Sequence, residues 1–273
     1  MAETEVRVLC STAEMDIVKT FECGQCFRWN ADEEGTYWGI AMGCPAKLWV
    51  QGDTVYIKSP GDMEMWREYF DLDRNYREIS RSFDGGEYLF NVCKLRLRHP
   101  HTAPGSWEAL CSFIISKCNN ITGIKGIVER LCSNFGRPVE FEGRTFYTFP
   151  SAAQVAELPA GALDVLRCGY RAPYISAAAI AVASGALDLN SLIKSDSSTA
   201  KRSLMALPGI GEKVANCVVL FGLNHMEAFP IDVWIRRALK EHFPQDFDPA
   251  CLGDCGLAQQ YIFYYARSTG DGK

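Results

Sequence analysis

Residues 206–217 read Ala-Leu-Pro-Gly-Ile-Gly-Glu-Lys-Val-Ala-Asn-Cys, and residues 229–234 read Phe-Pro-Ile-Asp-Val-Trp. The first stretch predicts two helices joined by a tight turn, because its proline ends a helix while Gly209 and Gly211 allow backbone conformations closed to other residues. Such a turn presents backbone N–H groups at the start of the second helix, where the helix dipole also favours an anion. The stretch therefore predicts a phosphate-binding turn, with Gly209, Gly211 and Val214 as its candidate residues.

Lys213 lies in the first turn of that second helix, where the dipole disfavours a cation, so its position needs a reason other than helix stability. Cys217 follows four residues later and shares its helix face. An amine beside a small apolar thiol and a positive helix end tends to lose its proton, and a nucleophilic amine must be unprotonated. Taken alone, Lys213 is better explained as a solvated surface lysine.

Asp232 follows a proline and precedes a helical stretch, so it is a candidate N-cap, a role compatible with chemistry. Leu-Pro-Gly-Ile-Gly-x-Lys, with Asp232 nineteen residues after the lysine in a Pro-x-Asp setting, resembles the helix-hairpin-helix DNA glycosylases. In that superfamily the lysine attacks a sugar carbon and the aspartate assists. The resemblance thus implies that Lys213 and Asp232 are catalytic.

The composition of the 273 residues is that of an ordinary globular protein, with 48% hydrophobic and 22% charged residues. A net charge of -5 argues against binding nucleic acid by bulk positive charge, so DNA would need a local surface. Basic residues do cluster, at 94–101 and around the hairpin. No apolar run is long enough to cross a bilayer and the N-terminus is acidic, so we expect a cytoplasmic or nuclear protein that is not secreted.

The chain has twelve cysteines, mostly scattered in apolar stretches, and buried free thiols are the simplest account. Cys23/Cys26 and Cys251/Cys255 together allow a four-thiolate zinc site, although only the first pair has the usual ligand spacing. Some glycosylases of the superfamily carry an iron–sulfur cluster on four cysteines after the catalytic aspartate. Only two follow Asp232, so we expect no cluster and no required cofactor. By the same resemblance, hairpin carbonyls are a candidate site for a structural cation, with no metal ligands from side chains.

Residues 1–85 carry the β signals, in aromatic or β-branched runs at 37–42, 47–50 and 54–57. Gln-Gly-Asp at 51–53 suits a tight hairpin, so we expect an antiparallel sheet, followed by a helix at 65–73. From about residue 85 onward the chain is expected to be helical. The apolar run at 106–116 predicts a helix at the centre of the core.

Residues 21–29 read Phe-Glu-Cys-Gly-Gln-Cys-Phe-Arg-Trp, which alone would suit a turn at a strand edge. The segment is also similar to the Gly-Gln-x-Phe-Arg-Trp of the eukaryotic-type 8-oxoguanine DNA glycosylases. In that family the glycine carbonyl accepts a hydrogen bond from N7–H, which oxidised guanine has and guanine lacks. The resemblance assigns this role to Gly24.

Two loops are candidates for contact with DNA. Asn119 and Asn120 stand at a helix junction, where asparagines commonly cap helices, but in the resembling family this junction enters the duplex in place of the extruded nucleotide. Tyr170 and Arg171 follow Gly169 between helices, and an aromatic with an arginine suits a wedge plus a donor to the base left behind. The ordinary alternative is a surface tyrosine with a solvated arginine.

Gln259 and Phe263 share a helix face near the C-terminus, so an amide could read a flipped base on which the ring stacks. Alone, this pattern is more typical of an aromatic core helix, but the family's C-terminal helix has glutamine and phenylalanine at matching positions. The resemblance implies a base pocket formed by Gly24, Cys217, Phe221, Pro230, Gln259 and Phe263.

The resemblance runs from about residue 21 to 267 and implies an α+β fold. An N-terminal antiparallel TBP-like β domain at 1–85 would pack on a helical region at 86–273, whose two subdomains would enclose the catalytic cleft. The implied activity is a bifunctional DNA glycosylase and AP lyase that flips 8-oxoguanine from duplex DNA and excises it through a lysine Schiff base. We expect a monomer. The alternatives are a glycosylase for alkylated purines and a non-catalytic DNA-binding protein.

Three departures from the family pattern matter. Cys118 replaces the first of three asparagines, Gly123 stands where eukaryotic members have an arginine that reads the opposite cytosine, and Trp234 replaces a phosphate-contacting histidine. Losing an arginine donor removes about 1–3 kcal/mol of discrimination. We therefore expect a relaxed preference for cytosine opposite the lesion.

Overall fold

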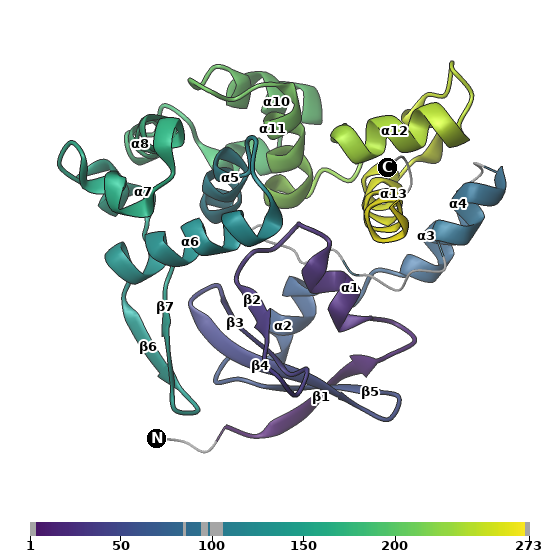
Figure 1. Cartoon of the computed structure of the whole chain (residues 1–273), viewed down its shortest axis with the longest axis horizontal. Coiled ribbons are helices and arrows are strands. Elements are labelled where there is room, and N and C mark those ends of the chain that lie inside the picture. The colour runs from purple at the N-terminus through teal and green to yellow at the C-terminus, as the bar shows by residue number, and fades with distance from the viewer. Residues whose placement is uncertain (1–3, 84–85, 94–97, 99–105, 271–273) are drawn as a thin grey trace.

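The computed structural model describes residues 4–83, 86–93, 98 and 106–270. The N-terminal part is a five-stranded antiparallel sheet in the order β1-β5-β4-β3-β2, below the helices in Figure 1. Its elements, in chain order, are β1 (Val6–Ser11), α1 (Ile17–Glu22), β2 (Trp29–Ala31), β3 (Tyr37–Ala41), β4 (Cys44–Gln51), β5 (Thr54–Lys58) and α2 (Met63–Tyr69). The expected mixed α+β fold with an N-terminal antiparallel sheet is confirmed.

The hairpin expected at 51–53 joins β4 to β5, with Gln51 paired to Thr54 and Gly52 at φ +59°. Aromatic residues form the core between the sheet and its helices. Trp29 from β2 is fully buried against Phe21 of α1, with ring centroids 4.6 Å apart, and against Trp66 of α2 at 6.0 Å. This packing holds α1 on the sheet and so positions the loop after it, residues 23–28, which points toward the helical part.

The rest of the chain is mainly helical. Its elements are α3 (Tyr76–Ser82), α4 (Gly86–Val92), α5 (Ser106–Ile115), α6 (Ile121–Phe135), β6 (Pro138–Phe141), β7 (Arg144–Tyr147), α7 (Ala152–Ala156), η2 (Ala162–Leu166), η3 (Gly169–Arg171), α8 (Ala172–Ala183), α9 (Leu189–Ile193), α10 (Ser197–Met205), α11 (Glu212–Cys217), η4 (Val218–Gly222), α12 (Val233–His242), η5 (Pro249–Leu252) and α13 (Cys255–Thr269).

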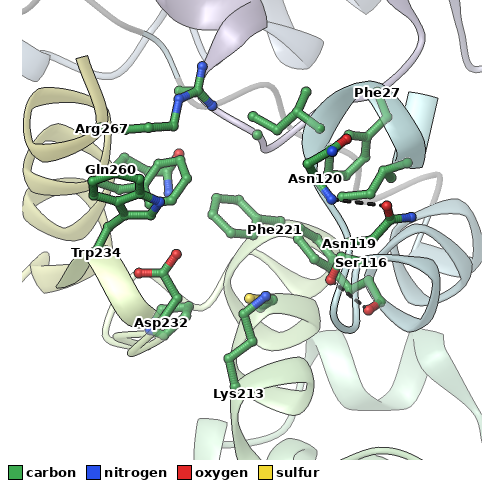
Figure 2. A pocket seen from close by; sticks show the side chains of 18 of the residues that line it. Phe27, Ser116, Asn119, Asn120, Lys213, Phe221, Asp232, Trp234, Gln260 and Arg267 are labelled. Atoms are coloured by element: carbon green, nitrogen blue, oxygen red, sulfur yellow. Dashed lines mark hydrogen bonds between the residues drawn. The ribbon is translucent and has the colours of Figure 1, made fainter. Parts of the chain in front are cut away.

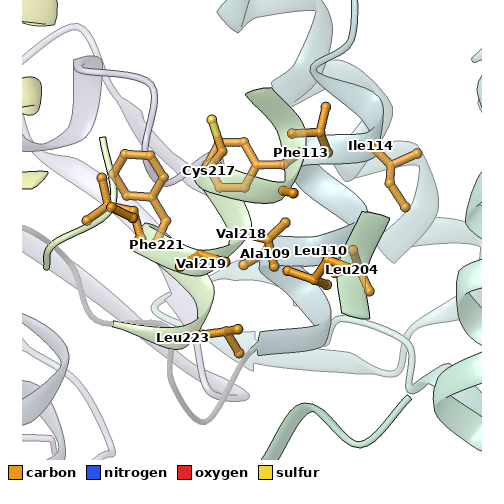
Figure 3. Packing of buried hydrophobic residues seen from close by; sticks show 14 of the residues in the cluster. Ala109, Leu110, Phe113, Ile114, Leu204, Cys217, Val218, Val219, Phe221 and Leu223 are labelled. Atoms are coloured by element: carbon orange, nitrogen blue, oxygen red, sulfur yellow. The ribbon is translucent and has the colours of Figure 1, made fainter. Parts of the chain in front are cut away.

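Helix α5 is central in this part, as its apolar run predicts, and eight of its ten residues are buried. Figure 3 shows how side chains of α5, such as Leu110 and Phe113, pack against Leu204 of α10 and against the Cys217–Leu223 stretch. The contact is close at Gly222, where an added Cβ would lie 2.8 Å from the Cβ of Ala109. The central helix therefore fixes the position of the helix that carries Lys213.

The expectation that everything after residue 85 is helical is wrong at one place, the β6–β7 hairpin. Its two-residue turn, Glu142 and Gly143, has φ values of +51° and +74°, the backbone that matches strand twist in a tight hairpin. The Glu142 carboxylate reaches the N-terminal sheet, where it lies 2.8 Å from both Lys47 and Lys58. The hairpin thus links the helical part to the sheet.

The proposed boundary at residue 85 falls outside the described residues and stays a prediction. Of the basic cluster at 94–101, Lys94, Arg96, His99 and His101 also lie outside them. Arg98 is described and is buried, with its guanidinium donating to the carbonyls of Glu14, Asp71 and Arg74 rather than facing solvent. In the parts of the chain that the structure describes, no helix combines the length and the apolar character needed to cross a membrane.

Candidate active site

The turn between α10 and α11 is the glycine-containing turn of the sequence prediction. Gly209 has φ +79°, and an added Cβ would lie only 2.4 Å from the ring of Tyr174, so the turn packs directly on this ring. Gly211 is the N-cap of α11 and has no side chain to cap the helix. The α11 helix continues into η4, a π-helical turn, which carries Phe221 on the same side as Cys217.

A cavity of about 470 Å³ opens between helices α5, α11 and α13. The loops that precede strand β2, helix α6 and helix α12 complete its wall. It brings together Lys213, Asp232 and all six residues expected to form a base pocket. Asn119, Asn120 and Trp234 also line it. Its other lining residues are Cys23, Phe27, Phe113, Ser116, Ile121, Thr122, Ile124, Gln260 and Arg267.

Lys213 and Asp232 approach the cavity from different elements and point into it (Figure 2). Asp232 is the N-cap of α12, where its Oδ1 accepts a hydrogen bond of 2.9 Å from the Ile235 N–H, so the capping interpretation is correct. Burial raises the pKa of Asp232, while the Ile235 hydrogen bond and the charge of Lys213 oppose this rise. Among the described residues, the Lys213 amine has no hydrogen-bond or salt-bridge partner, so it is available to a ligand.

Aromatic rings form one wall of the cavity. Phe113 stacks on Phe221 with centroids 5.2 Å apart and meets the edge of Phe27 at 5.9 Å. Cys217 lies beside Phe221, and burial raises the pKa of its thiol to about 11, against the opposing charge of Lys213. A neutral thiol and aromatic faces make a surface suited to a flat apolar ring.

Gly24 lines the cavity from another side, in the loop after α1. It has φ +73°, and a Cβ at this position would lie 3.2 Å from Ile121 and 3.5 Å from Phe263. Its neighbour Gln25 is buried and anchors the loop, since its Nε2 donates to the carbonyls of Thr20 at 3.0 Å and Arg98 at 2.6 Å. The loop therefore brings backbone close to the ring of Phe263.

Helix α13 supplies a polar wall. The amide nitrogen of Gln259 donates to the Pro230 carbonyl at 3.0 Å, and its Oε1 accepts from Gln260 Nε2 at 2.6 Å. Gln260 and Arg267 are missing from the sequence prediction, although both lie on the face of Phe263 at helical spacing. That periodicity could have found them.

The candidate DNA-contacting residues fall into two groups: Asn119, Asn120 and Trp234 line the cavity, and the others lie outside it. Asn120 caps α6, with its Oδ1 accepting from the Gly123 N–H at 2.7 Å, so the capping interpretation holds for it. Tyr170, Arg171, Gly209, Gly211 and Val214 lie outside the cavity lining.

Arg171 is partly buried and is not free in this structure. Its Nε and Nη2 donate to the carbonyl of Lys117, the former at 2.8 Å, and Nη2 also donates to that of Cys118 at 3.0 Å. Cys118 itself has φ +49°, an uncommon conformation outside glycine. Arg171 thus holds the turn that presents Asn119. The adjacent Tyr170 is about half exposed, at 49%.

The structure does not bring the four candidate zinc-binding cysteines together. Cys23, Cys26 and Cys255 are buried while Cys251 is exposed, and all four are free thiols. Among the described residues, no three histidine, cysteine, aspartate or glutamate side chains gather into a possible metal site. Burial instead raises the pKa of the Cys23 thiol, as expected for a thiol that packs in the core.

A glycine turn that carries a lysine, a carboxylate capping a later helix, and an aromatic cavity between them match the site expected from the resemblance to the helix-hairpin-helix DNA glycosylase class. Residues 7–110 match the family model of the 8-oxoguanine DNA glycosylase N-terminal domain. The N-glycosylase/DNA lyase of Saccharomyces cerevisiae is 34% identical over 270 residues, covering 87% of this chain and 70% of the yeast protein.

Solved structures of similar proteins superpose on this chain over nearly its whole length. MBOgg1 in complex with a low-affinity DNA ligand is 34% identical with a TM-score of 0.87, covering 97% of this chain and 96% of that one. The Clostridium acetobutylicum 8-oxoguanine glycosylase/lyase, bound to double-stranded DNA with cytosine opposite 8-oxoguanine, is 30% identical with a TM-score of 0.86, covering 94% and 93%. The chain therefore belongs to the 8-oxoguanine DNA glycosylase/lyase family.

Proposed function

We propose that this chain is a bifunctional enzyme of DNA repair that excises 8-oxoguanine from duplex DNA and then cleaves the strand at the abasic site. The observation that carries the proposal is the shared cavity of about 470 Å³, which holds an amine with no partner among the described residues, a partly buried carboxylate and an aromatic wall. The family match and the glycosylase/lyase named among the neighbours support the same activity.

The first chemical step is attack of the Lys213 amine on C1′ of the flipped nucleotide. The C1′–N9 bond breaks, and the base leaves with the bonding electron pair and takes up a proton. Asp232 stabilises the positive charge that develops on the sugar and helps to activate the amine. Its partly buried position strengthens this interaction, because charges interact more strongly away from water.

The second step cleaves the strand. The sugar ring opens to leave an imine between Lys213 and C1′, which acidifies the C2′ hydrogen. Loss of that proton expels the 3′ phosphate by β-elimination, and hydrolysis of the imine then frees the lysine. This sequence needs no cofactor. A structural cation at carbonyls of the hairpin turn remains compatible with the proposal.

The base would lie between Cys217 and Phe263, with the Gly24 carbonyl accepting from N7–H. Phe221, Pro230 and Gln259 complete this pocket, with Gln259 reading the Watson–Crick edge. The close approach of Gly24 to Phe263 supports this arrangement, because a side chain at residue 24 would narrow the slot for the ring.

DNA contact would come from two surfaces. The backbone at Gly209, Gly211 and Val214 would bind phosphate, with Trp234 near the flipped nucleotide. Tyr170 and Asn119 would wedge the duplex, with Asn120 beside them. Arg171 would bind the unpaired base by exchanging its hydrogen bonds to the Lys117 and Cys118 carbonyls for contacts to the base. The enzyme would act as a monomer on damaged double-stranded DNA, in the cytoplasm or, where there is one, the nucleus.

Borohydride trapping on duplex with a single 8-oxoguanine tests the proposal, because it reduces the imine to a stable covalent adduct. We expect wild-type protein to be trapped, and Lys213→Gln to lose both base release and trapping while it still binds duplex. Base release without trapping would instead indicate a monofunctional enzyme. Release of alkylated purines but not of 8-oxoguanine would indicate a glycosylase with a different substrate. Binding without either reaction would leave only a DNA-binding protein.

A further inference from the structure

The loop at residues 23–28, called the Gly24 loop below, is bonded at both ends to one amine from α6. Lys125 Nζ donates to Glu22 Oε1 at 3.0 Å and to the Trp29 carbonyl at 2.8 Å. Glu22 is the last residue of α1 and Trp29 is the first of β2, so the two bonds enclose the loop. An extended chain of seven residues would span roughly 23–25 Å, whereas here a single amine reaches both ends.

The two bonds are partly shielded from solvent. The Lys125 side chain is 16% exposed and that of Glu22 is 34% exposed. Glu22 also accepts a hydrogen bond from the Tyr37 hydroxyl of β3, so its carboxylate is held from two sides. Burial raises the pKa of the Cys26 thiol within the loop, and the positive charge of Lys125 opposes this rise. The amine therefore lies close to the middle of the loop as well as to its ends.

The same helix also contacts Gly24 directly. Ile121 lies one turn before Lys125 on α6, so the two side chains share a helix face. A Cβ on Gly24 would lie 3.2 Å from Ile121 Cδ1. Helix α6 therefore contacts the Gly24 loop at its glycine through Ile121 and at both of its ends through Lys125.

The groups that must act on one nucleotide come from two parts of the chain. Gly24 belongs to the N-terminal part with the sheet, whereas Lys213 and Phe263 belong to the helical part. Because a hydrogen bond weakens steeply as its angle departs from linear, a carbonyl that reads a base needs a fixed place relative to the base. Lys125 joins the two parts at the loop itself. Arg28 adds a bond from the end of the loop to the Tyr147 carbonyl, so the loop stays attached when Lys125 is replaced.

We propose that Lys125 is a positioning residue for recognition of the oxidised base. It holds the Gly24 loop so that the Gly24 carbonyl lies where N7–H of a flipped 8-oxoguanine can donate to it. Lys125 itself is outside the described lining of the cavity, so it acts through the loop and not on the substrate. The inference rests on the proposed function and adds that base recognition, but not strand cleavage, depends on α6 through this amine.

Comparing two substrates separates these two activities. Lys125→Met keeps the length of the side chain and removes its charge and donors. We expect it to slow single-turnover release of 8-oxoguanine roughly 5- to 150-fold, the range for a buried polar group left without its hydrogen bond. Borohydride trapping on a duplex with a preformed abasic site involves no base, so it should equal that of wild type. Lys125→Arg, which retains charge and donors, should release the base faster than Lys125→Met.

A binding measurement reports on recognition without the reaction. Lys213→Gln is expected to bind duplex without chemistry, so its affinities for duplexes with 8-oxoguanine and with guanine at the same position can be compared. Adding Lys125→Met should lower the ratio of the two affinities, because only the oxidised base has N7–H. A general loss of folded protein would lower both affinities together and leave their ratio unchanged.

Lys19→Met is the matched control, because it removes a lysine that pairs with Asp16 at the start of α1, away from the Gly24 loop. It should leave every rate unchanged. The inference is overturned if Lys125→Met releases the base at the wild-type rate, if abasic trapping falls equally, if Lys125→Arg is no faster, or if the affinity ratio is unchanged. Wild-type protein that is trapped on neither duplex would overturn the proposed function itself.

Discussion

At the scale of single residues, Asp232 combines a structural and an electrostatic role in one carboxylate. One oxygen caps α12 through the Ile235 N–H, while the charge of the group faces the amine of Lys213 across the cavity. Burial favours the protonated form and raises the pKa, because a carboxylate loses water around its charge. The ionised form that the proposed chemistry needs is therefore populated only at a higher pH than for an exposed aspartate.

The pH profile of base release should show this shift. The rate is expected to fall as pH decreases through the raised pKa of Asp232, so the acidic limb lies above 3.8, the ordinary value. Asp232→Asn should remove the limb and lower the plateau, by roughly 10²–10³-fold if the lost charge stabilises the transition state as an oxyanion-hole donor does. Single-turnover rates between pH 4 and 8 measure both the acidic limb and the plateau. If the acidic limb is unchanged in Asp232→Asn, it belongs to the titration of another group.

Gly123 shows how a missing side chain changes its surroundings. A Cβ here would lie 2.3 Å from Asn119 Oδ1, so the glycine lets the Asn119 side chain fold over the start of α6. Asn119 Oδ1 also accepts from the Asn120 N–H at 2.9 Å. The glycine therefore fixes how Asn119 is held, and it also lacks the side chain that, by the resemblance, would read the opposite base.

The opposite-base preference should respond to this position. Wild type is expected to discriminate weakly among the four bases opposite 8-oxoguanine, and Gly123→Arg should favour cytosine by about 1–3 kcal/mol, once Asn119 swings aside. Gly126→Arg is the matched control on α6, because its Cβ meets only the end of the Arg130 side chain, at 3.5 Å. Strong cytosine preference in the wild type would contradict the expectation.

At the scale of elements, the start of α13 is fixed against the segment that leads to Asp232. The Gly256 N–H donates to the Met226 carbonyl at 2.7 Å, and a Cβ on Gly256 would lie 2.4 Å from Leu220 Cδ1 and 2.8 Å from that carbonyl. Because backbone cannot yield as a side-chain end can, this glycine sets the distance between α13 and the 226–228 segment. Both walls of the cavity depend on that distance.

Gly256→Ala should therefore separate α13 from this segment. We expect a loss of about 1–3 kcal/mol in the free energy of unfolding, as for other overpacked sites, together with slower base release. Urea denaturation and single-turnover kinetics measure the two effects. Gly126→Ala, in a helix with space for a methyl group, should instead stabilise the protein slightly. Wild-type stability in Gly256→Ala would show that the contact relaxes freely.

The sequence predicts some elements better than others for physical reasons. The alternating strands and the apolar α5 have strong periodicity, and the hairpin turn with Lys213 and Asp232 has fixed spacing, so both are found in place. The β6–β7 hairpin has strands of only four residues each, and its Glu142–Gly143 turn is a weak signal inside a helical region. The bonds of Arg171 to the Lys117 turn are absent from any local pattern, because they join segments far apart in the chain.

At the scale of the whole molecule, the tip of the β6–β7 hairpin connects the helical part to the sheet. Hydrogen bonds from Lys47 and Lys58 lower the pKa of Glu142 to about 2, since they stabilise the carboxylate. A carboxyl group with a lowered pKa stabilises the fold above its unfolded value and loses this contribution as pH falls toward the folded value. The link therefore operates from about pH 4.5 upward and weakens toward pH 2.

Glu142→Gln should give a small decrease in Tm at pH 7, because the network is partly exposed to solvent and to salt. The difference from wild type should shrink as the pH is lowered from 4.5 toward 2. Thermal unfolding followed by circular dichroism measures this trend, with Glu129→Gln on the exposed face of α6 as the control. A difference that grows on acidification would contradict the assigned sign.

The contact between Gly209 and the ring of Tyr174 has a mechanical consequence. Lys117 reinforces it, with its amine 5.3 Å from the centre of that ring and 3.4 Å from the Gly209 carbonyl. We therefore expect the glycine turn and the loop of Tyr170 to move as one stiff unit. A stiff protein surface leaves the bending to its ligand. Lesions in easily kinked pyrimidine–purine contexts should then be processed faster than the same lesion within a rigid A-tract, although no side chain reads those neighbouring bases.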